Sequence, residues 1–443
     1  MSGIEKKLSS AQIIILGFAG VILLGSMLLM LPIATRDGRG AAFADALFTS
    51  TSAVCVTGLI VYDTAVYWTR FGQAVILMLI QIGGMGVVTV GAAVIMVSGK
   101  KINLKQRSTM QEAISAHKVG GIVNLTGFII KMTLIFELVG ALVMMPAFCG
   151  EFGLAGGMWR AVFHSVSAFC NAGFDLMGIR QEYSSLTFFA ENWIVNGAVM
   201  ALIIIGGIGF MTWDDIRTHR YRVRRYRMQS KVILTTTALL VTVPALYFFF
   251  FEFSGEPLYR RILMSCFQSV TPRTAGFNTA DLSRMSETGL GIIILLMLIG
   301  GSPGSTAGGM KTTTFAVLLS TAAAVFHRRE HAHFFGRRID NETVRSGVTV
   351  LVMYLTLFLG GGLIISRVEG LPLLPCMFET ASAMATVGLS LGLTPGLGLV
   401  SRGVLIVLMY IGRVGGLTLI FAAMSDSRGA NTARLPQEKL MVG

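Results

Sequence analysis

Four short segments of this chain carry the residue pattern of a site that binds an ion through backbone carbonyl groups. Each segment opens with a phenylalanine, reaches a glycine nine or ten residues later, and continues with Leu or Phe. Glycine permits the backbone conformations and the close approach that such a loop needs. The segments read FTSTSAVCVTGL (48–59), FHSVSAFCNAGF (163–174), FQSVTPRTAGF (267–277) and FETASAMATVGL (378–389).

The residues expected to supply carbonyl oxygens lie at the end of each segment. A ring of carbonyl groups replaces the hydration shell of a small monovalent cation. A single such glycine is usually a turn between amphipathic helices, whereas four in register favour an ion-binding ring. The expected ligands are Val56, Thr57, Gly58, Asn171, Ala172, Gly173, Thr274, Ala275, Gly276, Thr386, Val387 and Gly388.

Long apolar stretches flank these segments. Hydrophobic residues make up 53% of the 443 residues and charged residues only 13%, whereas soluble domains hold about 25% charged residues. With a mean hydropathy of +0.70, the composition excludes a soluble domain. Stretches able to cross about 30 Å of hydrocarbon are expected at 11–33, 73–97, 122–148, 192–212, 232–251, 288–326 (interrupted), 346–366 and 402–424.

The chain repeats one unit four times. A second motif, Ile-Gly, recurs in the apolar stretch after each segment, at Ile82-Gly83, Ile205-Gly206, Ile299-Gly300 and Ile411-Gly412, and repetition at a fixed spacing marks a repeat architecture. The expected units are 8–98, 120–216, 229–326 and 340–424, with a cytoplasmic tail at 425–443. We expect an all-α integral membrane fold with eight transmembrane helices and four re-entrant pore helices around one central pore.

The short segments explain why such a pore favours a cation. A helix of about ten residues is ~15 Å long, half a bilayer, so it must return to the side it came from. Its carboxyl end then points to the membrane centre and carries about half a negative charge. Four such ends around one axis favour a cation in a central cavity.

Basic residues set the expected orientation. The 36 Lys and Arg residues are concentrated at the termini and in alternate loops, which places both termini in the cytoplasm of a multi-pass inner-membrane protein. The densest cluster is Arg217, Arg220, Arg222, Arg224, Arg225 and Arg227. Between two spans, membrane lipid headgroups are a better partner for it than nucleic acid.

The segments resemble the filter sequences of the Ktr/Trk/HKT superfamily of K⁺ uptake proteins over nearly the whole chain: TSAVCVTGL (51–59), CNAGFD (170–175), PRTAGFNT (272–279) and ATVGLSLG (385–392). The early first repeat and the sequence CVTGL are most similar to KtrB-type membrane subunits. The resemblance implies a homodimer, one pore per subunit, and a cytoplasmic, nucleotide-binding RCK-type (KtrA-like) ring. It implies K⁺ as the substrate ion and no organic cofactor on this chain. Such uptake is often stimulated by Na⁺, but the sequence shows no Na⁺ site.

The sixth apolar stretch is interrupted by glycine and proline, and the resemblance implies that this loop obstructs the pore below the filter. Arg413 stands where the other units have Gly84, Gly207 and Gly301. An arginine inside a membrane is costly and by default functional, so we expect it to face the pore and bind loop carbonyls. The expected gate residues are Gly300, Gly301, Ser302, Gly304, Ser305, Thr306, Gly308, Gly309, Lys311 and Arg413.

Other polar residues in or near the spans carry weaker signals. We expect Lys131 and Glu137 to pack internally rather than bind ions. His164 and Glu379 share one offset at the start of two segments. They are read as ordinary polar groups at helix ends or as residues that shape the outer mouth.

Two other classes of membrane protein fit the sequence less well. A membrane-embedded enzyme needs convergent catalytic groups, and the sequence has no HExxH motif and no paired intramembrane carboxylates. A secondary cation transporter has repeats of opposite topology, whereas these units share one topology. The alternative kept open is a secondary transporter or a TrkH-like K⁺/H⁺ system, because the sequence leaves coupling to Na⁺ or H⁺ undecided.

Overall fold

The computed structural model describes residues 9–98, 102–114 and 121–416, so the expected tail at 425–443 lies outside the described residues. The first unit holds α1 (Ser10–Leu29), α2 (Phe43–Val54), α3 (Arg70–Met85) and α4 (Val87–Val97), and α5 (Leu104–Ile114) follows. The second holds α6 (Ile122–Phe169), α7 (Trp193–Gly207) and α8 (Phe210–His219). The third holds α9 (Met228–Tyr247), α10 (Leu258–Val270), α11 (Glu287–Leu298) and α12 (Thr312–Phe326). After the hairpin β1 (His333–Phe334) and β2 (Arg337–Arg338), the fourth holds α13 (Asn341–Glu369), α14 (Leu373–Met384) and α15 (Leu399–Val414).

Four helices are long and apolar enough to cross a membrane: α1, α6, α13, and α9 with the π-helical turn that extends it to Glu252. The 48 residues of α6 join a long helix to the second short segment at Gly153, where φ is +70°. The helices α11 and α12 are shorter apolar helices, and α15 ends beside the last described residue. The count of eight spans and the boundaries of the four units therefore stay predictions.

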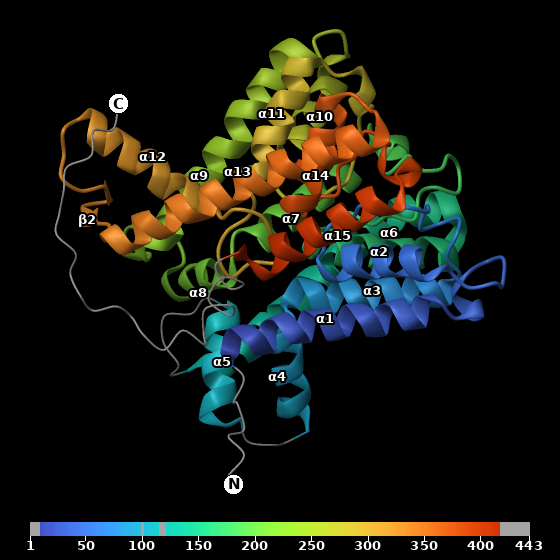
Figure 1. The fold of residues 1–443 in the computed structure, drawn as a ribbon, viewed down its shortest axis with the longest axis horizontal. Coiled ribbons are helices and arrows are strands. Elements are labelled where there is room, and N and C mark those ends of the chain that lie inside the picture. The colour runs from blue at the N-terminus through green and yellow to red at the C-terminus, as the bar shows by residue number, and fades with distance from the viewer. Residues whose placement is uncertain (1–8, 99–101, 115–120, 417–443) are drawn as a thin grey trace.

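Two of the expected spans are not continuous helices. The stretches 73–97 and 192–212 each bend by 96°, between α3 and α4 and between α7 and α8, and Figure 1 shows α4 leaving the line of α3. The breaks fall at Gly86 and Gly209, with φ of +86° and +92°, and Gly415 with φ +91° follows α15. All three lie four residues after the isoleucine of an Ile-Gly pair. The repeated glycine was therefore a signal for the break, because few other residues adopt this φ.

The Ile-Gly motif has a packing reason. A Cβ added to Gly83 would collide with the carbonyl of Val54, at the end of α2. The same holds for Gly206 against Phe169 and for Gly412 against Met384. In these units, glycine lets the second long helix touch the carboxyl end of the preceding short helix, where a side chain has no room.

The units are arranged in a closed ring. Contacts between neighbouring units join α3 to α6, α7 to α10, α11 to α14, and α15 back to α2. The last unit thus packs on the first, and Figure 1 shows α15 beside α2 although they lie at opposite ends of the described chain.

One hydrogen bond recurs within three units and supports their alignment. A serine on the short helix donates to a backbone carbonyl of the preceding long helix, and the two residues are 28 positions apart in each case. The pairs are Ser50 with Ile22, Ser165 with Glu137, and Ser269 with Val241. Each short helix is thereby fixed at the same height against its long helix.

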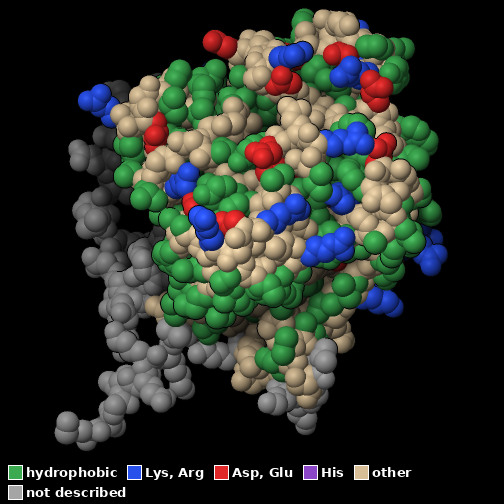
Figure 2. Space-filling model, turned by 90° about the vertical axis from the view of Figure 1, so that its right-hand side faces the viewer, with side chains coloured by type: hydrophobic (Ala, Val, Ile, Leu, Met, Phe, Trp, Pro, Cys, Tyr) green, Lys and Arg blue, Asp and Glu red, His purple; other side chains and the backbone are tan. Residues whose placement is uncertain are grey.

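The end of the molecule seen in Figure 2 carries acidic and basic side chains interspersed with hydrophobic ones. Ion pairs such as Arg180 with Glu151 and Arg284 with Asp281 are exposed at the surface. Exposed charges of both signs are typical of a surface in contact with water.

Candidate functional site

The ends of the four segments share an unusual backbone conformation. In each, the residue two before the glycine has a positive φ, the middle residue does not, and the glycine again has a positive φ. The φ pairs are +54° and +91° at Val56 and Gly58, +58° and +70° at Asn171 and Gly173, +69° and +79° at Thr274 and Gly276, and +53° and +93° at Thr386 and Gly388. Because the backbone alternates between left-handed and ordinary φ values, successive carbonyl groups point to the same side. Positive φ outside glycine is costly and tends to occur at functional sites.

The four glycines form a closed ring. A Cβ placed on any one of them would meet the backbone of the next unit, in chain order and from the fourth back to the first. The same Cβ would also meet the carbonyl oxygen of the middle ring residue in the next unit. It would collide with this oxygen on Ala172, Val387 or Thr57, and would lie 2.8 Å from it on Ala275. The added Cβ would lie 3.1 Å from the next glycine's Cα for Gly58, 3.0 Å for Gly173, 3.1 Å for Gly276 and 3.0 Å for Gly388. The structure therefore brings the expected ligands of all four units together around one axis.

Hydroxyl groups on the short helices hold the ring strands, by which we mean the three expected ligand residues at the end of each segment. Ser52 accepts a hydrogen bond from the backbone N–H of Gly58 at 3.1 Å, and Ser382 accepts one from Gly388 at 2.9 Å. At the same position, Ser167 donates to the carbonyl of Phe174 at 2.7 Å and Thr271 donates to that of Phe277 at 2.5 Å. The third unit thus has a threonine hydroxyl where the other three have a serine hydroxyl.

In the last three units, the residue after the opening phenylalanine has a role that the sequence left open. His164 accepts from the N–H of Leu176 at 3.3 Å, and the Gln268 amide donates to Asn278 at 2.9 Å. Glu379 accepts from Ser390 at 2.6 Å and from the N–H of Leu391 at 3.0 Å. These buried side chains tie the helix to the loop beyond the glycine. The shared offset of His164 and Glu379 was the signal that could have found this role.

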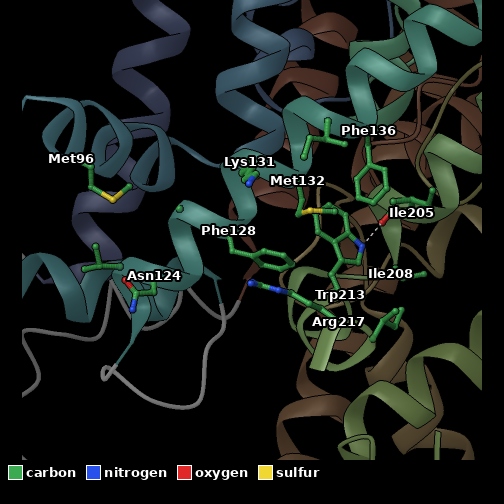
Figure 3. A pocket seen from close by; sticks show the side chains of 14 residues that line it. Met96, Asn124, Phe128, Lys131, Met132, Phe136, Ile205, Ile208, Trp213 and Arg217 are labelled. Atoms are coloured by element: carbon green, nitrogen blue, oxygen red, sulfur yellow. Dashed lines mark hydrogen bonds between the residues drawn. The ribbon is translucent and has the colours of Figure 1, made fainter. Parts of the chain in front are cut away.

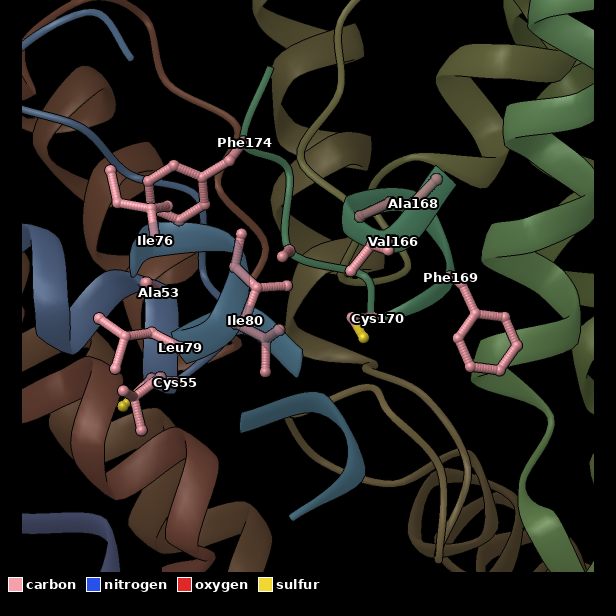
Figure 4. Close-up of a cluster of buried hydrophobic side chains, with 14 of the residues drawn as sticks. Ala53, Cys55, Ile76, Leu79, Ile80, Val166, Ala168, Phe169, Cys170 and Phe174 are labelled. Atoms are coloured by element: carbon pink, nitrogen blue, oxygen red, sulfur yellow. The ribbon is translucent and has the colours of Figure 1, made fainter. Parts of the chain in front are cut away.

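The carboxyl ends of α2 and of the short-helix part of α6 meet around α3 (Figure 4). Cys170, which precedes the second ring strand, lies against Gly84. Glu137 is buried behind it, accepts from the Gln81 amide at 3.3 Å, and has the Cys170 thiol 3.8 Å away. Glu137 therefore packs internally, as expected.

The loop between α11 and α12 lies against the carboxyl ends of two short helices. The Thr306 hydroxyl donates to the carbonyl of Phe169 at 3.0 Å. Gly308 is so close to Thr386 that a Cβ would collide with its hydroxyl. Lys311 turns back and donates to the carbonyl of Ala307 at 2.9 Å, which holds the loop in a tight turn. The expected break in the sixth stretch is confirmed, since residues 299–311 are not helical.

Other contacts of the loop reach the bend of the second unit. The N–H of Ser302 donates to the carbonyl of Gly207 at 3.0 Å. The N–H of Phe210 donates to the carbonyl of Gly304 at 2.7 Å. The expected gate residues are thus in contact with the ring strands and with the α7–α8 break.

Arg413 joins this loop to the first unit. Its guanidinium donates to the carbonyl oxygens of Thr306 and Gly83, and to that of Gly84 at 3.1 Å. The contact with a loop carbonyl was expected, and the two contacts with the end of α3 were not. Among the described residues no carboxylate lies within 4.0 Å of this guanidinium, so backbone oxygens are its partners.

A cavity opens on each side of the ring and loop. On one side, about 300 Å³ are lined by all four ring glycines together with Asp175, Tyr183, Asn278 and Ser390. On the other, about 330 Å³ are lined by Gly304, Gly309, Lys311, Arg413 and Glu112. The loop therefore lies between the ring and the second cavity. Within the described ranges, no group of three or more His, Cys, Asp or Glu is placed to hold a metal ion.

Comparisons with known proteins agree with this arrangement. The sequence profile of the TrkH family, described as a cation transport protein, matches residues 9–431. The chain is 40% identical over 450 residues to the potassium/sodium uptake protein NtpJ of Enterococcus hirae, covering 99% of this chain and 98% of that protein. It is 36% identical over 438 residues to the Ktr system potassium uptake protein B of Bacillus subtilis, covering 98% and 96%.

A solved structure supports the fold. The potassium transporter TrkH from Vibrio parahaemolyticus matches with a TM-score of 0.74, covering 95% of this chain and 86% of that one. At 21% identity this similarity bears on the fold alone. The expected resemblance to the Ktr/Trk superfamily is confirmed.

Proposed function

Because this chain belongs to the TrkH family of cation transport proteins, we propose that it takes up K⁺ across the cell inner membrane as the ion-translocating subunit of a Ktr-type system. The observation that carries the proposal is the closed ring of four glycines with alternating φ. The names of the relatives, potassium/sodium uptake protein and potassium uptake protein B, support K⁺ as the substrate.

The proposed path runs from the outer cavity through the ring. There the carbonyl oxygens of the twelve ring residues replace water around the ion. The carboxyl ends of the four short helices add negative potential at the same depth, which favours a cation over an anion. No covalent chemistry is needed, so the chain is a transporter and not an enzyme.

The loop at 299–311 is the proposed gate. Its contacts with Phe169, Thr386 and Arg413 support a closed position directly below the ring. Lys311 and Arg413 also place positive charge at the inner cavity, which raises the energy of a cation there. Opening requires the loop to leave these contacts.

Regulation and assembly belong to the same proposal. The word system in the name of the B. subtilis relative supports a partner subunit. We propose a cytoplasmic, nucleotide-binding RCK-type ring acting on a homodimer, with both termini cytoplasmic. Stimulation by Na⁺ is the second candidate property, favoured by the potassium/sodium name of the E. hirae relative.

The test is growth of a bacterium that lacks K⁺ uptake, at low K⁺, expressing this chain with and without an RCK partner. Rescue that requires the partner supports the full proposal, and rescue without it removes the regulatory part. No rescue by a well-expressed chain with its partner would mean that the ion or the coupling is wrong. Repeating the assay across Na⁺ concentrations and pH separates Na⁺ stimulation and H⁺ coupling from passive flux.

A further inference from the structure

A groove of about 980 Å³ lies between α4, the first turns of α6 and the bend from α7 to α8. Figure 3 shows its lining, in which Arg217 reaches the ring of Phe128 and Lys131 lies further along α6, beside Met132. Ile135 and Ile216 also line it and are each 40% exposed. The groove is thus open to the outside and mainly apolar, with two cationic side chains in its lining.

The two cationic side chains lack a carboxylate partner among the described residues. Arg217 stacks over the ring of Phe128 at 4.8 Å, and Lys131 is exposed. In the described part of the chain, no Asp or Glu oxygen lies within 4.0 Å of either side chain. The expectation that Lys131 packs internally is therefore wrong. Its position on α6 turns it into the groove, whereas Glu137 faces the ring.

The position of Lys131 along α6 favours an anionic partner. It lies about nine residues into α6, or ~13 Å of helix from Ile122. An unpaired cation at that depth in hydrocarbon is costly unless an anion reaches it. Basic pockets between transmembrane helices are known to bind anionic lipid headgroups.

We propose that this groove binds one anionic phospholipid, with its phosphate between Lys131 and Arg217 and an acyl chain along Met132, Ile135, Ile205 and Ile216. The apolar wall favours a lipid over free phosphate, which offers nothing to cover it. The net charge of +13 favours an anionic occupant over a second copy of this chain.

The groove shares a wall with the proposed gate. Trp213 lines it and donates through its indole N–H to the carbonyl of Ile205 at 3.0 Å, across the α7–α8 bend. Next to that bend, the N–H of Phe210 donates to Gly304 in the loop. A bound lipid that stabilises the bend therefore stabilises the position of the loop.

The experiment is native mass spectrometry of the full chain in detergent with added phosphatidylglycerol or phosphatidylcholine. Each basic residue near a headgroup contributes about five-fold in affinity. We therefore expect phosphatidylglycerol to bind about five-fold more weakly to Lys131→Gln or to Arg217→Gln, and about 25-fold more weakly to the double variant. The matched control is Arg328→Gln with Arg337→Gln, two exposed arginines outside both the groove and the 217–227 cluster with the same loss of charge, which keep the affinity of the native chain.

A second variant tests the apolar part without changing charge. Gly127 lines the groove on α6, and a Cβ there meets no atom within 4 Å. Gly127→Leu fills the groove and is expected to remove the binding of phosphatidylglycerol and of phosphatidylcholine. Gly197→Leu on α7 is the control, because its Cβ also meets nothing within 4 Å and it lies outside the groove.

Several outcomes would overturn the proposal, and none depends on transport activity. One is that the double variant or Gly127→Leu binds phosphatidylglycerol as tightly as the native chain. Another is that either control loses as much phosphatidylglycerol affinity as the variant it is matched to. Lipid binding that begins only after residues 417–443 are removed would make that segment the occupant. If Gly127→Leu converts a dimer to monomers and leaves lipid binding unchanged, the groove is an interface between two copies of this chain.

Discussion

The guanidinium of Arg413, on α15, donates a hydrogen bond to the carbonyl oxygen of Thr306, in the loop between α11 and α12. The same guanidinium also binds Gly83 and Gly84 at the end of α3. One side chain thus ties the loop to the first and the last unit. Because the loop lies under the ring, we expect this tether to hold the loop in the proposed closed position.

Arg413→Ala is expected to give a leakier pore with the fold intact. Loss of one charge-assisted hydrogen bond, about 1.5–3 kcal/mol, weakens the closed loop and raises flux by about 10-fold or more, since 1.4 kcal/mol is a factor of ten. The measurement is Rb⁺ uptake into vesicles at matched protein density. Arg413→Lys keeps the charge but not the fork of donors and should be intermediate. Unchanged flux in a well-expressed Arg413→Ala protein would contradict the gating role.

Deletion of Gly304–Gly309 is expected to raise flux as well. The loop segment that contacts Phe169, Thr386 and Arg413 is then gone, so the ring opens directly to the inner cavity. Vesicle uptake beside a thermal-unfolding curve is the appropriate pair of measurements, because Gly304 also supports α8. A fall in flux at equal expression would show that the loop is structural.

Gly58→Ser is expected to let Na⁺ through the pore. Position 58 has φ +91°, and its Cβ would collide with the carbonyl of Ala172, so the ring must widen or lose a ligand. The ratio of Rb⁺ to Na⁺ flux measures this. The control Gly370→Ser has φ +67° at the end of α13 with no atom within 4 Å, so it carries only the strain of about 1–2 kcal/mol. Equal selectivity in the two variants would remove Gly58 from the filter.

The ion pair between Asp45 and Arg402, at 2.6 Å, closes the ring between the first and fourth units. Tyr62 donates to the same carboxylate at 3.2 Å. We expect Asp45→Asn and Arg402→Gln each to lower the melting temperature, and the double variant to lose less than the sum. The coupling expected for contacting residues is about 0.5–3 kcal/mol. Additive losses in this double-mutant cycle would mean that the pair does not hold the seam.

Much of the site was predictable from local patterns. Glycine at Gly58, Gly173, Gly276 and Gly388 is required by the backbone itself, so the requirement is visible in four aligned segments. The apolar stretches and the break at Gly300–Gly309 follow from hydropathy and helix propensity, which are local properties. The bends at Gly86 and Gly209 were missed although the repeated glycine was present, because hydropathy alone cannot separate one long helix from two short ones.

The sequence by itself determined the membrane class, the fourfold internal repeat and the glycines that the ring requires, because each depends on residues close together in the chain. Only the tertiary structure decided the closed order of the units, the bonds of Arg413 to residues 107 and 330 positions away, and the turn of Lys131 toward a groove while Glu137 faces the ring. These depend on which helices pack side by side, and any of several apolar faces would satisfy hydropathy equally well. The choice among them is made by close contacts at glycines and by partners for buried polar groups, which exist only once the four units have closed.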